Sequence, residues 1–462
     1  MKPTYEELEF LLKESLEAHA KTQHILKLAL ERIAALEERL NKNSKNSSKP
    51  PSSDRKGNTD SPKNDKKSRM GINRTPIPPE KIDQFIACSL DLCPDCGSKD
   101  LLDEGNPETL QQVELPEIKA IVTEFSCKKY KCTCCGNRSM ANLPTGIPNS
   151  SFGVRLMALI ANLTGVLHLS KRDAIRLLKD LYGIAICEGS IINVEERVAS
   201  ALKTVYERIH EVVTKGTLSK HFDETSWRDR GKNQFVWVAS TNQAVCFKID
   251  PSRSRKAFYN FVGILGASSV VTDRYAVYNN VSKTHQYCLA HLIRDFRKFA
   301  ERKGWDGEIG EAIAKGLCIA CKAHRNYKQG KISLKSRNMR LGHIRKKIEG
   351  CLIDGMANGS DDLAKFCENI LDASENLWTF AKFTDVEPTN NLAERDLRQL
   401  VLWRKKSYGT RSDRGQRFVE RISSVAETLK RESKNIIDFL NQAVTAFFSG
   451  WEAPHICGAA GY

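Results

Sequence analysis

The segment VVTDRYAVY, from Val270 to Tyr278, begins with the β-branched residues of a buried strand and then reaches an aspartate, Asp273. Burying an unpaired carboxylate is energetically costly. Asp273 must therefore lie at the mouth of the strand, beside a neutralising partner, or against a bound cation.

Three more strand-like segments precede Val270, separated by short turns. They are TLSKHFDETSW from Thr217, FVWVAST from Phe235 and AVCFKID from Ala244. A short amphipathic helix, SRSRKAFYNFVG, then leads into the fourth strand, SSVVTD. Three meandering strands, a helix and another strand predict a ribonuclease H-like fold. In that fold a right-handed crossover places the fourth strand parallel to the first and beside it.

Three acidic residues are the candidate catalytic groups of this fold. Asp223 in the first strand and Asp273 after the fourth would be close neighbours, and such carboxylates repel each other unless one is protonated or a divalent cation lies between them. The third is Glu394, in the first turns of a helix that Asn390 or Asn391 would cap. This arrangement predicts a site for two Mg²⁺ ions, or Mn²⁺. Asp223 would bridge both ions, while Asp273 and Glu394 would each hold one.

The segment from Glu394 to Lys434 is strongly basic, with 12 Lys and Arg residues against 6 Asp and Glu. That balance is suited to contacts with DNA phosphates. We expect the DNA-binding side chains of this segment to be Arg395, Arg398, Arg404 and Lys405, with Lys406 beside them.

Composition sets limits on the class of protein. The chain has 462 residues and a formal net charge of +16, which favours a nucleic-acid partner, although a merely soluble basic protein is the alternative. It has no run of apolar residues long enough to span a membrane, and its first segment carries acids where a signal peptide is apolar. We therefore expect a cytoplasmic protein whose 15 cysteines are thiols or metal ligands.

Two C-x-x-C knuckles lie in the first third of the chain. Cys93 and Cys96 form one, Cys132 and Cys135 the other, and a glycine follows each. The doubled pattern predicts a zinc ribbon over residues 85–148, with four thiolates around one structural Zn²⁺. Further candidate ligands are Cys127 and Cys134. A catalytic zinc is not expected, because its ligands usually include a histidine or a carboxylate.

The N-terminal residues predict a long helix followed by a linker. Leu26, Ala29, Ile33, Leu36 and Leu40 recur at steps of three and four, as in a coiled coil. The alternatives for residues 1–41 are a self-associating helix and a lone amphipathic helix packed on its own chain. Residues 42–84 are rich in Asn, Ser, Lys and Pro, which predicts a flexible basic linker.

Residues 150–212 have a helical pattern that includes a candidate helix-turn-helix. Ser170 would cap the first helix, Gly183 would end it, and Ser190 would cap the second. Such a unit would present Ser190 and Asn193 to the major groove, with Lys171 and Arg172 near the DNA backbone. The alternative is a helical hairpin that only packs.

Several of these motifs resemble those of DDE-type transposases of the insertion-sequence 66 family. The similarity lies in the linker phrase KNSKNSSKPPSSD, the paired knuckles, HFDET, VTDRYAVY, CLAH-x-x-R and NNLAER. One departure is Arg274, where glycine is usual. The resemblance implies that the acidic triad is Asp223, Asp273 and Glu394, and that Cys288 and His291 form the family's C-x-x-H motif.

The resemblance also implies a function. The protein would cut transposon ends by hydrolysis and join the released 3′-hydroxyl to target DNA. It would act as a homo-oligomer on double-stranded DNA, and companion proteins of the same element would be its partners. It would associate with the nucleoid of a prokaryote. Cys288 and His291 would support the active site, or would be a core thiol and a capping imidazole.

The sequence thus predicts a multidomain α+β protein. A ribonuclease H-like core with a mixed sheet spans 213–450, with a helical insertion at about 295–383 and a tail at 451–462. The alternatives in function are a non-catalytic or domesticated zinc-ribbon DNA-binding protein and a ribonuclease H-like nuclease without strand transfer.

Overall fold

The computed structural model describes residues 4–41, 75–102, 105, 108–265 and 268–456. The chain divides into two units, one of Met1–Arg55 with Val122–Tyr462 and one of Lys56–Ile121. Most of the predicted linker and the end of the predicted tail lie outside the described residues. The predicted domain boundaries therefore stay a prediction.

A five-stranded mixed sheet lies at the centre of the larger unit, with the strand order β5-β4-β3-β6-β7. Its strands are β3 (Lys220–Asp229), β4 (Lys232–Ser240), β5 (Val245–Asp250), β6 (Val270–Thr272) and β7 (His285–Tyr287). The first three form an antiparallel meander. As predicted, β6 runs parallel to β3 and beside it, with Lys220 opposite Val270 and His221 opposite Val271.

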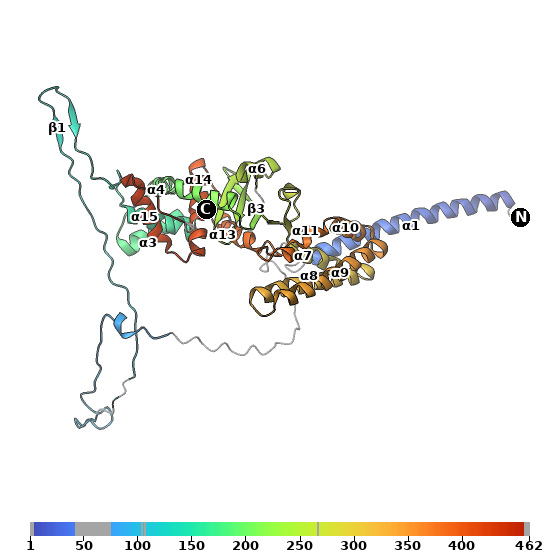
Figure 1. Ribbon diagram of the computed structural model, residues 1–462, viewed down its shortest axis with the longest axis horizontal. Coiled ribbons are helices and arrows are strands. Elements are labelled where there is room, and N and C mark those ends of the chain that lie inside the picture. The colour runs from blue at the N-terminus through green and yellow to red at the C-terminus, as the bar shows by residue number, and fades with distance from the viewer. Residues whose placement is uncertain (1–3, 42–74, 103–104, 106–107, 266–267, 457–462) are drawn as a thin grey trace. The chain divides into compact units, whose positions relative to one another are not determined.

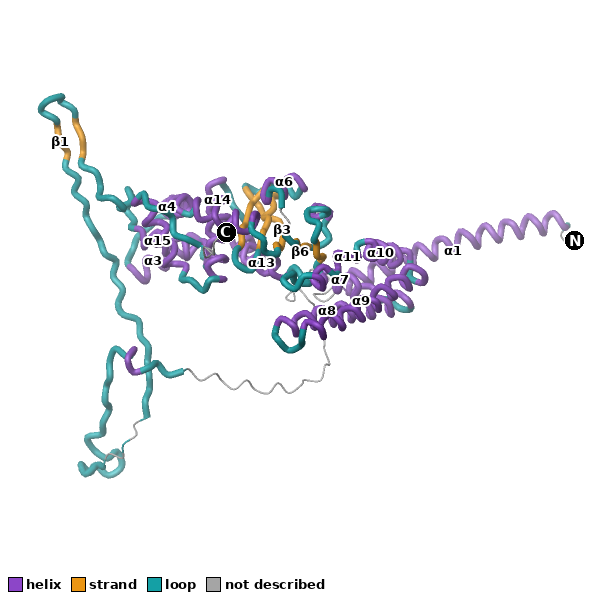
Figure 2. The backbone as a smooth tube through the Cα atoms, viewed as in Figure 1, coloured by secondary structure: helices purple, strands orange, loops and turns teal. Residues whose placement is uncertain are grey.

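Helices cover both faces of this sheet. Phe222 of β3 packs edge-on against Phe258 of α6 (Arg255–Val262), with ring centroids 5.1 Å apart. The preceding residue, His221, meets Asn390 at the start of α13 (Asn391–Ser407). Because successive residues of a strand point to opposite faces, α6 and α13 lie on opposite faces, as Figure 2 shows.

The remaining helices of the larger unit form two groups, and Figure 1 shows their places. One group packs on the sheet in a common hydrophobic core with it. Its members are α2 (Val154–Ala161), α3 (Lys171–Tyr182), α4 (Glu188–Ala201), α5 (Lys203–Lys215), α14 (Asp413–Arg431) and α15 (Ile436–Ser449). The mixed α+β class is therefore confirmed.

The second group of helices follows β7 and has a core of its own, which includes Leu292, Leu317 and Leu352. The segment predicted as a helical insertion falls within this group. Its helices are α7 (Leu289–Ala300), α8 (Trp305–Lys328), α9 (Leu334–Asn358), α10 (Asp361–Asp372), α11 (Ser374–Leu377) and α12 (Thr379–Lys382).

The predicted helix pair is present as α3 and α4. The predicted ends are correct for α3, but the predicted start is wrong for α4. The Ser170 side chain caps α3 by accepting a hydrogen bond from the Asp173 N–H, and Gly183 ends the helix with a φ of 65°. The prediction that Ser190 caps α4 is wrong. The helix begins at Glu188, and the Ser190 hydroxyl inside it lies 3.3 Å from Cys187 Sγ. An acidic residue in the first turn suits the positive end of the helix dipole, which explains the earlier start.

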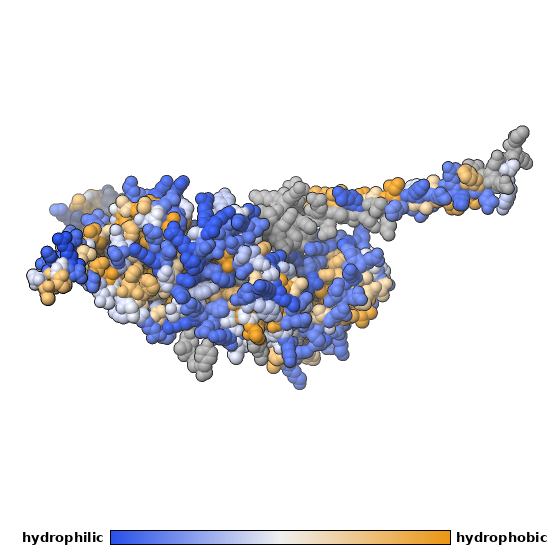
Figure 3. Space-filling view, turned by 90° about the horizontal axis from the view of Figure 1, so that it is seen from above, coloured by the Kyte–Doolittle hydropathy of each residue, from blue (hydrophilic) through white to orange (hydrophobic). Residues whose placement is uncertain are grey.

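The N-terminal segment is one helix, α1 (Tyr5–Asn41), as predicted. Its hydrophobic residues Leu26, Ile33, Leu36 and Leu40 are exposed, and Figure 3 shows hydrophobic side chains along its visible surface. None of the helices among the described residues is both long and apolar enough to cross a membrane. Self-association through α1 stays a prediction.

Little regular structure is present among the described residues of the predicted zinc ribbon. A short antiparallel hairpin joins β1 (Lys129–Lys131) to β2 (Arg138–Met140). In the smaller unit, the short helix η2 (Pro79–Lys81) is preceded by Ile77, whose backbone N–H and C=O both bond to the Gln111 side chain, at 2.6 and 2.8 Å.

Candidate active site

The register of the sheet places two aspartates side by side. His221 of β3 pairs with Val271 of β6, so two residues further along Asp223 is level with Asp273. Asp273 directly follows Thr272, the last residue of β6. Each carboxylate accepts one backbone hydrogen bond, Asp223 from the Glu224 N–H (2.8 Å) and Asp273 from the Tyr275 N–H (2.9 Å).

The third predicted acid, Glu394, lies in the first turn of α13. Asn390 occupies the N-cap position, as predicted, but its side chain does not cap the helix. Its Nδ2 instead donates to the Phe222 carbonyl (2.8 Å), and its Oδ1 lies 3.2 Å from Nδ1 of His221. Asn390 thereby fixes the start of α13 on the two residues that precede Asp223.

The electrostatics of Asp223 link the three acids. Burial raises the pKa of Asp223 well above its ordinary value, and the charges of Glu224, Asp273 and, less strongly, Glu394 raise it further. A carboxylate in this position is destabilised by its neighbours. A divalent cation beside it would relieve the repulsion, so the residues present fit such an ion.

A fourth acid, Glu224, has a different function from its neighbour. Its side chain is buried, accepts hydrogen bonds from Nε of Arg253 (2.8 Å) and from the Tyr278 hydroxyl, and lies on the face of β3 opposite to Asp223. Burial raises the pKa of Glu224 although both hydrogen bonds lower it. Glu224 thus ties the segment after Asp273 to β3. Glu224 is the second acid of the HFDET motif, but the sequence analysis did not consider it as a structural residue.

Arg274, which stands where glycine was expected, fits the backbone without strain. Arg274 is not among the described non-glycine residues with a positive φ, so its backbone does not require glycine. Its guanidinium donates to Asp295 of α7 (2.8 Å) and lies over the ring of Phe366, 4.8 Å from the centroid. The arginine therefore fastens the loop after β6 to the helical group.

The C-x-x-H motif lies next to Glu394. Cys288, at the start of α7, accepts a hydrogen bond on Sγ from the Asn390 backbone N–H (3.1 Å). Nδ1 of His291 lies 3.6 Å from Oε1 of Glu394, and both atoms are buried without a hydrogen-bond partner. Among the described residues, Cys288, His291 and Glu394 are the one group of metal-ligating side chains whose ligand atoms all lie within 4.8 Å of one another. The carboxylates of Asp223, Asp273 and Glu394 are less tightly clustered.

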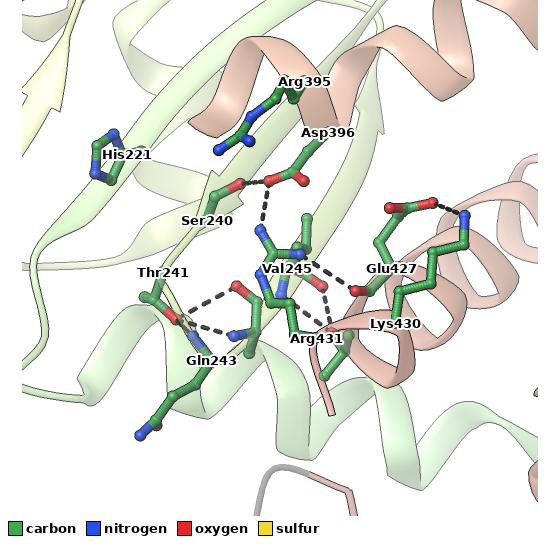
Figure 4. A network of polar contacts seen from close by, with 12 residues as sticks. His221, Ser240, Thr241, Gln243, Val245, Arg395, Asp396, Glu427, Lys430 and Arg431 are labelled. Atoms are coloured by element: carbon green, nitrogen blue, oxygen red, sulfur yellow. Dashed lines mark hydrogen bonds and ion pairs between the residues drawn. The ribbon is translucent and has the colours of Figure 1, made fainter. Parts of the chain in front are cut away.

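A buried polar network sets the rotation of α13 (Figure 4). Oδ2 of Asp396, two residues after Glu394, accepts hydrogen bonds from the Ser240 hydroxyl (2.6 Å) and from Arg431 (2.8 Å). Asp396 is buried, so losing either partner would leave a charge poorly compensated. The network therefore joins α13 to β4 and α14, and it holds Glu394 on the face that carries Asp223.

The basic residues of α13 that were predicted to bind DNA differ in whether the protein's own groups already engage them. Arg395, Arg398 and Lys405 are exposed on α13. Arg404 is not free, because its guanidinium bonds to the backbone carbonyl and the hydroxyl of Ser226 on β3. Burial lowers the pKa of Arg404, and the charge of Arg228 lowers it further.

The residues of α3 and α4 that were predicted to contact DNA also differ in their exposure and in their ion pairs. Lys171 forms an ion pair with the buried Glu195 (2.5 Å), and Arg172 forms an exposed pair with Glu188 (2.9 Å). Asn193 is exposed on α4 and Ser190 is partly buried. Lys171 therefore holds the two helices together, whereas Asn193 remains accessible.

A basic pocket, which sequence reasoning did not predict, lies where the segment after α13 meets the end of β3. The Thr410 N–H donates to the Arg228 carbonyl (2.9 Å), and its carbonyl accepts from the Arg230 N–H (3.0 Å). Gly409 has a φ of 95°, and a Cβ there would lie 2.0 Å from the Arg228 carbonyl oxygen, so glycine is required. The pocket has a volume of about 600 Å³ and is lined by Arg228, Arg230, Gly231, Tyr408, Thr410 and Arg411. Arg230 already pairs with Asp413 (2.8 Å), whereas Arg228 and Arg411, with the exposed Tyr408, are suited to a phosphate backbone.

The two cysteine knuckles have the same backbone geometry. In each, the first cysteine's carbonyl accepts from the glycine N–H four residues later, at 2.9 Å for Cys93 and 3.0 Å for Cys132. Backbone N–H groups, led by those of Cys96 and Cys135, lower the pKa values of Cys93 and Cys132. Each knuckle is therefore arranged to favour the thiolate that zinc requires.

Comparison with known families identifies the chain. Residues 149–417 match the family described as "Transposase IS66 family", and residues 91–136 match the "zinc-finger binding domain of transposase IS66". Residues 2–75 match a family of unknown function, and no curated protein matches the chain. Because the first match covers more than half of the 462 residues, the chain belongs to the IS66 family of transposases. Its zinc-finger match supports a structural zinc ion and a DNA partner.

Proposed function

We propose that this transposase is a DDE enzyme whose catalytic acids are Asp223, Asp273 and Glu394, held in a ribonuclease H-like core. The observation that supports this most strongly is the parallel pairing of β3 with β6, which sets Asp223 level with Asp273. The attachment of α13 to β3 through Asn390 supports a place for Glu394 on the same face of the sheet, and the charge of Glu394 is the smallest of those that raise the pKa of Asp223.

Oxygen donors of this kind suit Mg²⁺ or Mn²⁺. When bound, these ions would neutralise charge on the phosphodiester and activate the attacking oxygen. Asp223 and Asp273 would hold them from the sheet, and Glu394 from α13. The backbone N–H groups that bond to the two aspartates orient their carboxylates, and Asp396 fixes the helix that carries Glu394.

The reaction consists of two exchanges of phosphorus–oxygen bonds. Water attacks the phosphodiester at the transposon end and releases a 3′-hydroxyl. That hydroxyl then attacks a phosphodiester of the target DNA, and the displaced strand leaves with its own 3′-hydroxyl. Exposed Arg398 and Lys405, with the basic pocket at Arg228 and Arg411, would bind the DNA backbone. Action as a homo-oligomer and with companion proteins stays a prediction.

The test is strand cleavage and joining on DNA that carries the transposon ends, with Mg²⁺. Asp223→Asn and Glu394→Gln should each lower both steps by at least about 100-fold, the usual effect of removing one electrostatic contact to the transition state. The control is Glu368→Gln, an exposed acid on α10 that should retain the wild-type rate.

The products of this assay separate the alternatives. Cleaved strands without joined strands would indicate a nuclease, and DNA binding without cleavage would indicate a non-catalytic protein. Full activity in either acidic variant would contradict the assignment of the triad.

A further inference from the structure

We propose that Cys288, His291 and Glu394 form a second metal site, which is separate from the zinc knuckles and shares Glu394 with the proposed Mg²⁺ site, and that it binds Zn²⁺ or an ion of similar softness. The three residues come from the start of α7 and the first turn of α13, which are hydrogen bonded to each other through Cys288 and Asn390.

The distances favour an ion over a hydrogen bond. Nδ1 of His291 lies 3.6 Å from Oε1 of Glu394, beyond the roughly 2.7–3.2 Å of an N–H···O hydrogen bond. Two ligand atoms on one tetrahedral zinc are about 3.3–3.6 Å apart, given zinc–ligand bonds of about 2.0–2.3 Å. Because all three ligand atoms lie within 4.8 Å of one another, only a small movement of side chains would close the site.

The two facing atoms also need a partner. Both Nδ1 of His291 and Oε1 of Glu394 are buried and make no hydrogen bond. Leaving one buried polar atom unpaired costs about 1–3 kcal/mol. A cation between them would satisfy the imidazole nitrogen and the carboxylate at once.

The donor set selects the metal. A thiolate, an imidazole and a carboxylate suit Zn²⁺, whereas Mg²⁺ requires oxygen ligands. The backbone N–H groups of Asn390, His291 and Ala290 lie beside Sγ of Cys288 and favour its thiolate, whereas burial and the charge of Glu394 oppose it. Binding of the ion would displace the thiol proton to solvent. The same N–H groups would then stabilise the thiolate.

Three protein ligands leave the fourth position of a tetrahedral ion open to water or to a phosphate oxygen. An ion at this site would also draw Glu394 away from Asp223 and Asp273. Zinc would therefore compete with the Mg²⁺-dependent reaction, a consequence that rests on the proposed function. The binding of zinc itself does not depend on that function.

Zinc content of the full-length protein tests the site directly. After incubation with Zn²⁺ and removal of the unbound ion, wild type should contain one more equivalent per chain than Cys288→Ser or Glu394→Gln. The matched control is Cys351→Ser, a partly buried thiol on α9 outside the site, which should retain the wild-type content. Substitution by Co²⁺ should give thiolate-to-metal absorption that is weaker in Cys288→Ser. Thermal unfolding of each variant checks that it is folded, and Glu394→Gln preserves the size of the side chain.

Equal zinc content in wild type, Cys288→Ser and Glu394→Gln would overturn the site, whatever the activity of the protein. To test whether zinc competes with the Mg²⁺-dependent reaction, the joining rate of wild type and of Cys288→Ser is measured at several zinc concentrations. Each rate is divided by the rate of the same protein without zinc. The zinc concentration for half inhibition should rise at least about 10-fold in Cys288→Ser. An unchanged value would refute the competition.

Discussion

At the scale of single residues, the raised pKa of Asp223 sets folding stability against its proposed function. Its raised pKa means that the folded protein holds a proton there at a pH where the unfolded chain has lost it. Folding stability therefore falls as the pH rises from the ordinary aspartate pKa to the raised one, and the penalty persists at higher pH. The carboxylate that burial and neighbouring charges make unfavourable for folding is one that the proposed chemistry requires.

This conflict gives a prediction for Asp223→Asn. In buffer without Mg²⁺ at neutral pH, the variant should have a higher Tm than wild type, because the repelled charge is removed. The difference should shrink as the pH is lowered through the raised pKa towards 4, about the ordinary value of aspartate. Addition of Mg²⁺ should raise the Tm of wild type more than that of the variant. Calorimetry across pH checks this, and a variant less stable than wild type at neutral pH would argue against charge crowding.

Asn390, together with Asp396, holds the helix that carries Glu394. Asn390→Ala removes the hydrogen bond to the Phe222 carbonyl and the contact with His221. We expect a loss of about 1–3 kcal/mol in the free energy of unfolding, since buried polar groups lose their partners. The joining rate should fall in the variant even at temperatures where it is fully folded. Asn391→Ala, at an exposed position one residue later, is the control, and equal effects of the two substitutions would count against this function of Asn390.

At the scale of elements, a helix rather than another strand covers the edge of the sheet that β5 forms. Three side chains of α14, spaced four residues apart, accept hydrogen bonds from alternate N–H groups of β5. The pairs are Thr428 with Val245, Ser424 with Phe247, and Glu420 with Ile249, at 3.1, 2.9 and 2.7 Å. Four residues of helix rise about 6.0 Å and two residues of strand about 6.7 Å, so the two repeats keep in step over this length. The edge that would otherwise pair with another chain is thereby covered.

Ser424→Ala tests this ladder. The variant would leave the buried N–H of Phe247 unpaired, and we expect the free energy of unfolding to fall by about 1–3 kcal/mol. Ser423→Ala is a close control, because Ser423 is also buried on α14 but makes no hydrogen bond to β5. Chemical denaturation measures both. A similar, small loss in each variant would show that the ladder contributes little.

At the scale of the whole molecule, the sequence predicted the sheet better than it predicted the surroundings of the acids. Alternation and turns were sufficient for β3, β4 and β5, and the predicted crossover placed β6 beside β3 correctly. β7 was not predicted, since three residues are too short to show a pattern. The contacts of Cys288 and Asn390 join residues about a hundred positions apart, and no local pattern encodes such a pairing.

Local rules also failed where two competing signals were close together. Ser190 has the chemistry of a cap, but the helix begins earlier, at Glu188. Lys171 and Arg404 were predicted to contact DNA, and in the structure Glu195 and the Ser226 backbone engage them, so their contact with DNA stays a prediction. Whether a basic side chain is free depends on neighbours that only the fold brings to it. The matches to the IS66 family cover residues 149–417 and 91–136, and they leave the function of each acid to experiment.

Asp223, Asp273 and Glu394 are proposed to share one divalent-metal site when DNA is bound. Diffraction from crystals of the protein with transposon-end DNA and Mn²⁺, recorded near the manganese absorption edge, would locate the ions. We expect anomalous peaks in contact with all three carboxylates. Peaks that contact none of them, or a Glu394 carboxylate that stays with Cys288 and His291 while the DNA is cut, would contradict this proposal.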